Sequence, residues 1–272
     1  MSRQSSRLVP QLQQETTVHI TTDGIVLRER AMHDHDSILT LLTCERGIIS
    51  AYARGVRKPR STLRASAELI SCSCFVLFCN KGNYSLDKAD LTQLFMGVRG
   101  DVEKLSLASY FCQLTAEIAP HEEQGGEYLS LLKNTLYLLD QDKRSCAFLK
   151  PVYELRLLTM AGYMPNLVAC AGCACYESEQ MFFLPQTSVI VCKDCVQKYP
   201  ADQLRMPLTR GVLTAMRHIL YADHQKLFAF TLSEPSLKRL GDITENYVMM
   251  QTEKRYDTLD FYHQIMAYHQ AT

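Results

Sequence analysis

Two equally spaced cysteine pairs carry the most specific chemistry in this sequence. Cys170 and Cys173 form one C-x2-C pair, and Cys192 and Cys195 form a second pair 18 residues further on. Each pair places two sulfurs on one side of a turn, and a hairpin between the pairs would bring all four together as a tetrahedron. The spacing therefore predicts one zinc ion per chain. Because four thiolates leave no position for an activated water, this zinc would be structural.

Three further points bear on the zinc prediction. Cys175 lies two residues after Cys173, and we interpret it as a spare thiol because it falls outside the two equal pairs. Redox disulfides at the C-x-x-C pairs remain the alternative. His121 and Glu123 form the H-x-E element of zinc deaminases, but those enzymes have a proline before their C-x-x-C, where this chain has Ala169 and Val191. We interpret that element as a coincidence in an interhelical loop.

A basic segment is the second strong feature. Residues 54–64 hold five cations and no acid, whereas the whole chain is balanced, with 29 basic and 29 acidic residues. Ser61 and Thr62 add neutral phosphate donors. The segment predicts a loop that binds the DNA backbone, with a salt slope near −3.5 at about 0.7 per phosphate on a single strand. A solvated loop without a partner is the alternative. The predicted DNA-binding residues are Arg54, Arg57, Lys58, Arg60 and Arg64, with Tyr52 as a base-stacking platform.

Composition excludes several other classes of protein. With a formal net charge of zero, no global field attracts the chain to nucleic acid or to a membrane, so a DNA site must be local. No window reaches the roughly 18 apolar residues of a membrane span, and residues 1–17 lack a signal-peptide core. We expect a soluble, intracellular protein without a membrane partner. Eleven cysteines argue against a complete disulfide framework. Six of them are expected in the core: Cys44, Cys72, Cys74, Cys79, Cys112 and Cys146.

Periodicity predicts an α+β protein. Short β-branched segments at residues 24–28, 37–43, 48–54, 69–78 and 84–88 suggest a five-stranded barrel such as an OB-fold. After Gly100 apolar residues recur at helical spacing, and Ser233 resembles an N-cap followed by Pro235. The predicted divisions are a polar, disordered extension at 1–17, an OB-fold DNA-binding domain at 18–95, and a helical domain at 100–272 with a zinc-binding insertion at 166–200. A hairpin of residues 181–184 and 188–191 is expected within that insertion.

The common catalytic and nucleotide-binding signatures do not occur in this sequence. It contains no G-x-x-x-x-G-K-[ST], G-x-G-x-x-G, G-x-S-x-G or H-E-x-x-H. Acids are scattered rather than clustered as a nuclease metal site would require. These absences favour a binding protein that is not an enzyme. The rival reading, a zinc hydrolase or deaminase, predicts turnover that a chelator abolishes.

Several separate segments resemble the bacterial RecO family, in the family's order. They comprise residues 22–27, 38–43 before Gly47, 53–57, 153–158 leading to Gly162 and Tyr163, and the paired cysteines around Phe182 and Phe183. The resemblance runs from about residue 20 to 262. It implies an amino-terminal OB-fold followed by a helical domain with an embedded zinc motif. The family's basic DNA-contacting segment aligns with Arg54, Arg57 and Lys58, and less closely with Arg60 and Arg64.

The resemblance also implies a function in the RecF pathway. Such a protein binds single- and double-stranded DNA and anneals complementary strands. With RecR it helps a RecA-class recombinase replace single-stranded DNA-binding protein on gapped DNA. The alternative is a zinc-ribbon transcription or adaptor protein that binds DNA and protein without annealing.

Overall fold

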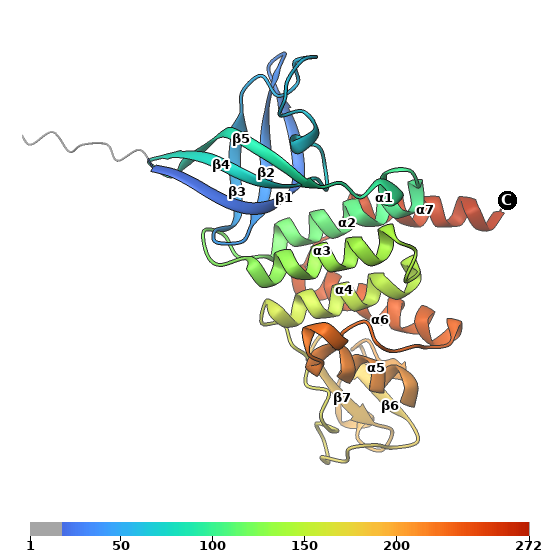
Figure 1. Cartoon of the computed structure of the whole chain (residues 1–272). Coiled ribbons are helices and arrows are strands. Elements are labelled where there is room, and N and C mark those ends of the chain that lie inside the picture. Colours follow the sequence, from blue (N-terminus) through green and yellow to red (C-terminus); the bar gives the residue numbers. More distant parts are fainter. Residues whose placement is uncertain (1–17, 272) are drawn as a thin grey trace, which may run out of the picture.

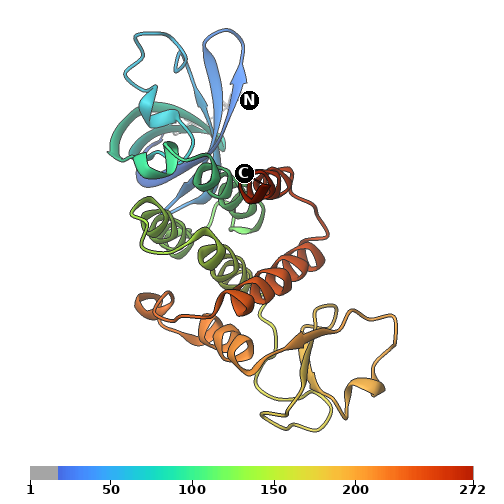
Figure 2. The same ribbon diagram turned by 90° about the vertical axis from the view of Figure 1, so that its right-hand side faces the viewer.

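The computed structural model describes residues 18–271, and the predicted extension at 1–17 lies outside the described residues. A β-barrel comes first, a layer of helices follows, and a small sheet is inserted between two of the helices (Figure 1). The barrel and the small sheet lie at opposite ends of the molecule, with the helices between them (Figures 1 and 2). The predicted α+β class and the order of its parts are confirmed.

The barrel strands are β1 (Val18–Met32), β2 (Asp36–Thr43), β3 (Gly47–Ala53), β4 (Cys72–Asn80) and β5 (Asn83–Gln93). Their order is β1-β2-β3-β5-β4, and the ring closes because β1 pairs with both β2 and β4. Only the β3–β5 contact is parallel. This five-stranded closed arrangement agrees with the predicted OB-fold.

Two strand boundaries differ from the sequence prediction. β1 is much longer than residues 24–28 because its first half pairs with β4 and its second half with β2. Its polar residues are therefore fixed by pairing rather than by burial. β4 begins at Cys72 and not at residue 69, because Ile70 adopts a left-handed φ of 58° and its N–H bonds the Val26 carbonyl at 2.9 Å.

The turn between β2 and β3 joins the barrel to the helices. Gly47 has a φ of +53°, and a Cβ there would lie 2.1 Å from the Pro120 carbonyl oxygen, so a side chain would collide with that loop. The Ile48 N–H donates to the same oxygen at 2.8 Å, and the Gly125 N–H donates to the Cys44 carbonyl at 2.9 Å. Backbone hydrogen bonds thus fix the barrel against the loop between α2 (Val102–Ile118) and α3 (Gly126–Asp140).

Helices build the middle of the molecule. Side chains of Asp101, Ser145 and Thr209 accept backbone N–H groups at the starts of α2, α4 and α5. Ser233 stands at the predicted N-cap of α6, but its hydroxyl donates to Ser236 instead of capping the backbone. The last helix, α7, was not predicted, and it packs on α2. The bounds are α1 (Met96–Arg99), α2 (Val102–Ile118), α3 (Gly126–Asp140), α4 (Cys146–Met160), α5 (Arg210–Tyr221), α6 (Glu234–Thr252) and α7 (Asp257–Ala271).

The small sheet lies between α4 and α5 in sequence. Its strands are β6 (Met181–Leu184), β7 (Val189–Cys192) and β8 (Met206–Leu208), in the order β7-β6-β8. Met181 pairs with Cys192, so the end of the hairpin presents a cysteine. The predicted hairpin is confirmed with a shift of one residue in its second strand, whereas β8 was not predicted.

The expected burial of six cysteines holds for three of them. Cys72, Cys112 and Cys146 are buried, whereas Cys44, Cys74 and Cys79 are only half-buried. The prediction was wrong in this detail for Cys74, because the alternation of β4 turns the neighbouring Phe75 inward and Cys74 to the outer face.

A buried ionic network holds three helices together. The Glu154 carboxylate on α4 is fully buried and lies 2.9 Å from the Lys150 ammonium. Tyr110 of α2 donates to Glu154 Oε1 at 2.8 Å, and Thr244 of α6 donates to Oε2 at 2.6 Å. Lys150 also pairs with Glu245 at 2.8 Å. Lys150 thus serves two carboxylates, and His263 Nε2 lies 3.0 Å from Glu245 Oε2, so each buried charge has a polar partner, as low-dielectric burial requires.

Glu154→Ala should lower the free energy of unfolding by about 3–5 kcal/mol, because it removes one partner from a buried, hydrogen-bonded ion pair. Urea denaturation followed by circular dichroism measures the change. The matched control is Glu117→Ala, which removes a half-exposed partner of Lys254 and should cost less than about 1 kcal/mol. Equal losses of unfolding free energy in the two variants would contradict the proposed contribution of the buried network to stability.

Candidate nucleic-acid interface and metal centre

The basic segment forms the connection that follows β3. Residues 54–64 make successive turns before a short 3-10 helix, η1 (Ala65–Ala67), on the side of the barrel away from the helices (Figure 2). All five cations of the loop are exposed. Within residues 18–271 none of the five forms a salt bridge with a carboxylate. Their charges are therefore available to a ligand.

The turn between β1 and β2 anchors this loop. Asp36 accepts the Gly55 N–H at 2.6 Å and also the Tyr52 hydroxyl, and the His35 carbonyl accepts the Arg57 N–H at 3.0 Å. Gly55 has a φ of +64°, which favours glycine there. The Tyr52 hydroxyl, followed by the Gly55 N–H, lowers the pKa of Asp36, so this carboxylate stays ionised. No sequence signal marked Asp36, because the Gly55 contact spans 19 residues of chain.

The loop divides its cations between two hollows. Arg57 and Arg64 line a hollow of about 230 Å³ together with Glu29 and Glu68, so an anion there would also face two carboxylates. The second hollow, of about 490 Å³, contains no acid, and an anion would meet only cations and neutral donors there. It is lined by Arg54, Gly55, Lys58, Arg60, Ser61, Thr62 and Leu63. We call it the phosphate hollow.

The aromatic residues of the barrel strands differ in exposure. Phe75 and Tyr84 are buried in the barrel, whereas Tyr52 is 36% exposed. Tyr52 borders a further hollow of about 580 Å³ that also includes Ser50 and Ser85. Its hydroxyl donates to Asp36, the carboxylate that also accepts the N–H of Gly55 in the phosphate hollow, so the ring is held near that hollow. A ring held next to a cationic surface suits base stacking.

The two hollows predict different contributions to DNA binding. Arg54→Ala with Lys58→Ala and Arg60→Ala should weaken single-strand binding at least about tenfold and flatten the salt slope by about 2, since each phosphate contributes about 0.7. Arg57→Ala with Arg64→Ala is the matched control, with an expected loss below about threefold because Glu29 and Glu68 share that hollow. Salt-titrated fluorescence anisotropy measures both. A larger loss in the control variant would contradict the division.

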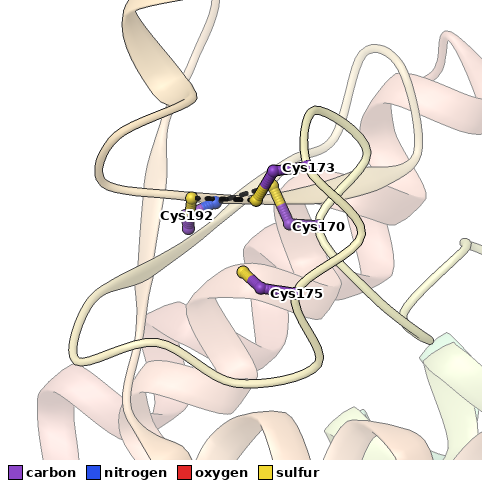
Figure 3. Close-up of side chains that lie close together, drawn as sticks. All are labelled: Cys170, Cys173, Cys175 and Cys192. Atoms are coloured by element: carbon purple, nitrogen blue, oxygen red, sulfur yellow. Dashed lines mark hydrogen bonds between the residues drawn. The ribbon is translucent and has the colours of Figure 1, made fainter.

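A cluster of thiols lies at the other end of the molecule. The ligand atoms of Cys170, Cys173, Cys175 and Cys192 all lie within 4.8 Å of one another (Figure 3). Cys173 Sγ and Cys192 Sγ are 3.7 Å apart. A tetrahedral zinc site with Zn–S bonds of about 2.3 Å has S–S edges of about 3.8 Å. The donors and their spacing therefore fit a single zinc-type ion.

This cluster differs from the predicted quartet in one member. Cys175 belongs to it and Cys195 does not, although Cys195 is buried close by. The cause is a backbone reversal at Ala174, which has a left-handed φ of 60° and donates its N–H to the Cys170 carbonyl at 2.8 Å. The Cys170 N–H in turn donates to the Cys175 carbonyl at 2.8 Å, which folds Cys175 back toward Cys173. Pair spacing alone does not encode this reversal.

Backbone donors prepare two of the thiols for ionisation. Burial opposes the ionisation of Cys170, but the N–H groups of Cys192 and Gly172, at 3.2 and 3.4 Å from its sulfur, contribute to lowering its pKa to about 6. The Cys175 N–H lowers the pKa of Cys173. Burial raises the pKa of Cys195 to about 12. A metal binds thiolates, so binding at this cluster would release protons and strengthen as pH rises.

Arg217 of α5 clamps the segment that carries the first thiols. Its guanidinium donates to the carbonyls of Leu167, Val168 and Tyr176 at 2.8, 3.0 and 2.9 Å. It also lies 3.9 Å above the centre of the Tyr176 ring. These contacts span 41 to 50 residues of sequence, so no local pattern could have shown them.

Arg217→Ala should lower zinc affinity by about 10–100-fold, because it frees both ends of the loop that holds Cys170, Cys173 and Cys175. Competition with a chromophoric chelator measures this affinity. Arg210→Ala is the control on the same helix, since its side chain is 84% exposed and pairs only loosely with Glu177 at 3.4 Å. An unchanged affinity in Arg217→Ala would show that the clamp does not position the ligands.

The deaminase-like element is separate from the thiols. His121 and Glu123 lie between α2 and α3, as predicted, and His121 bridges Gly47 at the barrel junction. The cysteine insertion lies at the far end of the helices (Figure 1). The element and the cysteines therefore do not form one site.

Within residues 18–271, no helix combines the length and apolar character needed to cross a lipid bilayer.

An OB-type barrel with a cationic loop, joined to helices that carry a thiol cluster, is the architecture of this modular protein. Family models specify it further: residues 17–95 match Recombination protein O N terminal and residues 99–260 match Recombination protein O C terminal. The chain belongs to the RecO family and is a DNA repair protein with a role in recombination.

Curated relatives are similar to this chain over most of its length. The DNA repair protein RecO of Acetivibrio thermocellus is 31% identical over 243 residues, which cover 89% of this chain and 96% of that protein. The DNA repair protein RecO of Symbiobacterium thermophilum is 29% identical, with 88% and 94% covered. That of Alkaliphilus metalliredigens is 25% identical, with 86% and 94% covered.

Proposed function

We propose that this chain is a recombination mediator that binds single- and double-stranded DNA and anneals complementary strands. With RecR, it helps a RecA-class recombinase load onto DNA coated by single-stranded DNA-binding protein. The observation that carries the proposal is the phosphate hollow, where Arg54, Lys58 and Arg60 converge without a carboxylate. Its location on the OB-type barrel supports DNA as the ligand. Membership of the RecO family supports the mediator role.

The proposed contribution to annealing is electrostatic. Two complementary strands repel each other through their phosphates, and cations that neutralise one backbone reduce that repulsion. The contacts of the phosphate hollow would be to the backbone, leaving base edges free to pair. Tyr52 would stack on a base beside the hollow and limit the motion of the strand. None of these roles requires bond-making chemistry by the protein.

We infer further that the protein acts without catalysis and holds one structural zinc ion. A four-thiolate set completes the coordination of zinc and supplies no open position for an activated water. The side chains of this site would then stabilise the fold of the insertion, because metal binding and local folding are coupled. We place the protein on the nucleoid in the cytoplasm, where DNA and the recombination partners are found.

Annealing of strands coated with single-stranded DNA-binding protein tests this function. Adding the full-length protein should accelerate duplex formation between two labelled complementary oligonucleotides. The triple variant Arg54→Ala, Lys58→Ala, Arg60→Ala should reduce that acceleration at least about tenfold, since it removes the cations of the phosphate hollow. Energy transfer between the labels measures the rate.

The variant Arg57→Ala with Arg64→Ala serves as the control and should anneal nearly as well as the unmodified chain. If the unmodified protein binds the strands yet leaves their annealing rate unchanged, the mediator proposal is contradicted and an adaptor role is favoured. A turnover that a chelator abolishes would contradict the non-catalytic proposal.

A further inference from the structure

The metal centre contains one more thiol than a zinc ion can bind. Cys170, Cys173, Cys175 and Cys192 form the tight group, and Cys195 is buried beside it. A Cβ placed on Gly172 would lie 2.8 Å from Cys195 Sγ and 3.8 Å from Cys170 Sγ, so the Gly172 backbone packs closely against both sulfurs. Structural zinc takes four ligands in a tetrahedron. One of the five thiols must therefore remain outside the coordination shell.

Three of the thiols are fixed by the fold. Cys170 Sγ accepts the N–H groups of Gly172 and Cys192 at 3.4 and 3.2 Å, which orients it toward the centre. Cys173 and Cys192 hold their sulfurs at 3.7 Å, the spacing of a tetrahedral edge (Figure 3). These contacts join the loop after α4 to the end of β7. Cys170, Cys173 and Cys192 are therefore common to any ligand set.

Two cysteines from different segments could supply the fourth metal ligand. Cys175 is half-buried and reaches the group through the left-handed turn at Ala174. Cys195 approaches from the opposite strand segment, where its N–H donates to the Cys192 carbonyl at 3.1 Å. Each comes from a short turn rather than from a helix or strand. A small change in either turn would exchange one sulfur for the other.

We propose that Cys175 and Cys195 are alternative fourth ligands of one divalent metal ion, with Cys170, Cys173 and Cys192 as the constant three. The inference rests on the zinc site proposed above. In the exchange, the incoming thiol loses its proton as its sulfur binds the metal, and the departing thiolate takes up a proton. The metal keeps its charge and four thiolates throughout, so no oxidant or reductant is needed. One protonated thiol always remains beside the filled site.

Metal retention by single and double serine variants tests the exchange. Cys175→Ser and Cys195→Ser should each keep one zinc per chain, with affinity within about tenfold of the unmodified protein, because the other thiol completes the site. The double variant should lose affinity more than about a hundredfold, since only three thiols remain. Metal analysis and chelator competition give both quantities, and Cys74→Ser on the barrel is the control for an unrelated thiol.

Cobalt substitution provides a second readout that does not depend on affinity. Both single variants should retain the absorption of a tetrahedral four-thiolate cobalt site, and the double variant should lose it. Loss of metal from either single variant alone, with a circular dichroism spectrum like that of the control, would overturn the exchange. Retention by the double variant would overturn it as well. Absence of metal from the unmodified chain would contradict the zinc proposal itself, which separates the two failures.

Discussion

The hydrogen bonds from Gly55 and Tyr52 to the Asp36 carboxylate determine how the basic loop is presented on the barrel. They tie the start of the basic loop to the turn that precedes β2. Without that anchor, five mutually repelling cations would spread into solvent, and the hollow formed by Arg54, Lys58 and Arg60 would lose its shape. One half-buried carboxylate thus organises a cationic surface through hydrogen bonds.

The basic loop and the thiol cluster lie far apart in the molecule. The cationic loop lies on the barrel, and the thiol cluster lies beyond the helices at the opposite end (Figure 1). The ionic network around Glu154 holds α2, α4 and α6 together between them. A metal in the cluster would therefore stabilise the insertion and α5 through Arg217, rather than contact DNA on the barrel.

Local sequence patterns predicted much of this structure, whereas features that depend on contacts between distant residues were not predicted. Five short β-branched segments identified the barrel, and the paired cysteines identified the thiol cluster. The approach of Cys175 to the cluster was not predicted, because it depends on the reversal at Ala174. Asp36 and Arg217 were missed because their partners lie 19 and up to 50 residues away. The assignments of individual DNA contacts and metal ligands remain predictions.

Hydrogen–deuterium exchange of the full chain with a single-stranded oligonucleotide tests the central claim most directly. The amides of residues 54–64 are predicted to exchange more slowly when DNA is bound, since phosphates then cover the loop that Asp36 holds in place. Protection should weaken as salt is added. Slowed exchange confined to the helices or to the cysteine insertion, with the loop unchanged, would contradict the assignment of DNA binding to this surface.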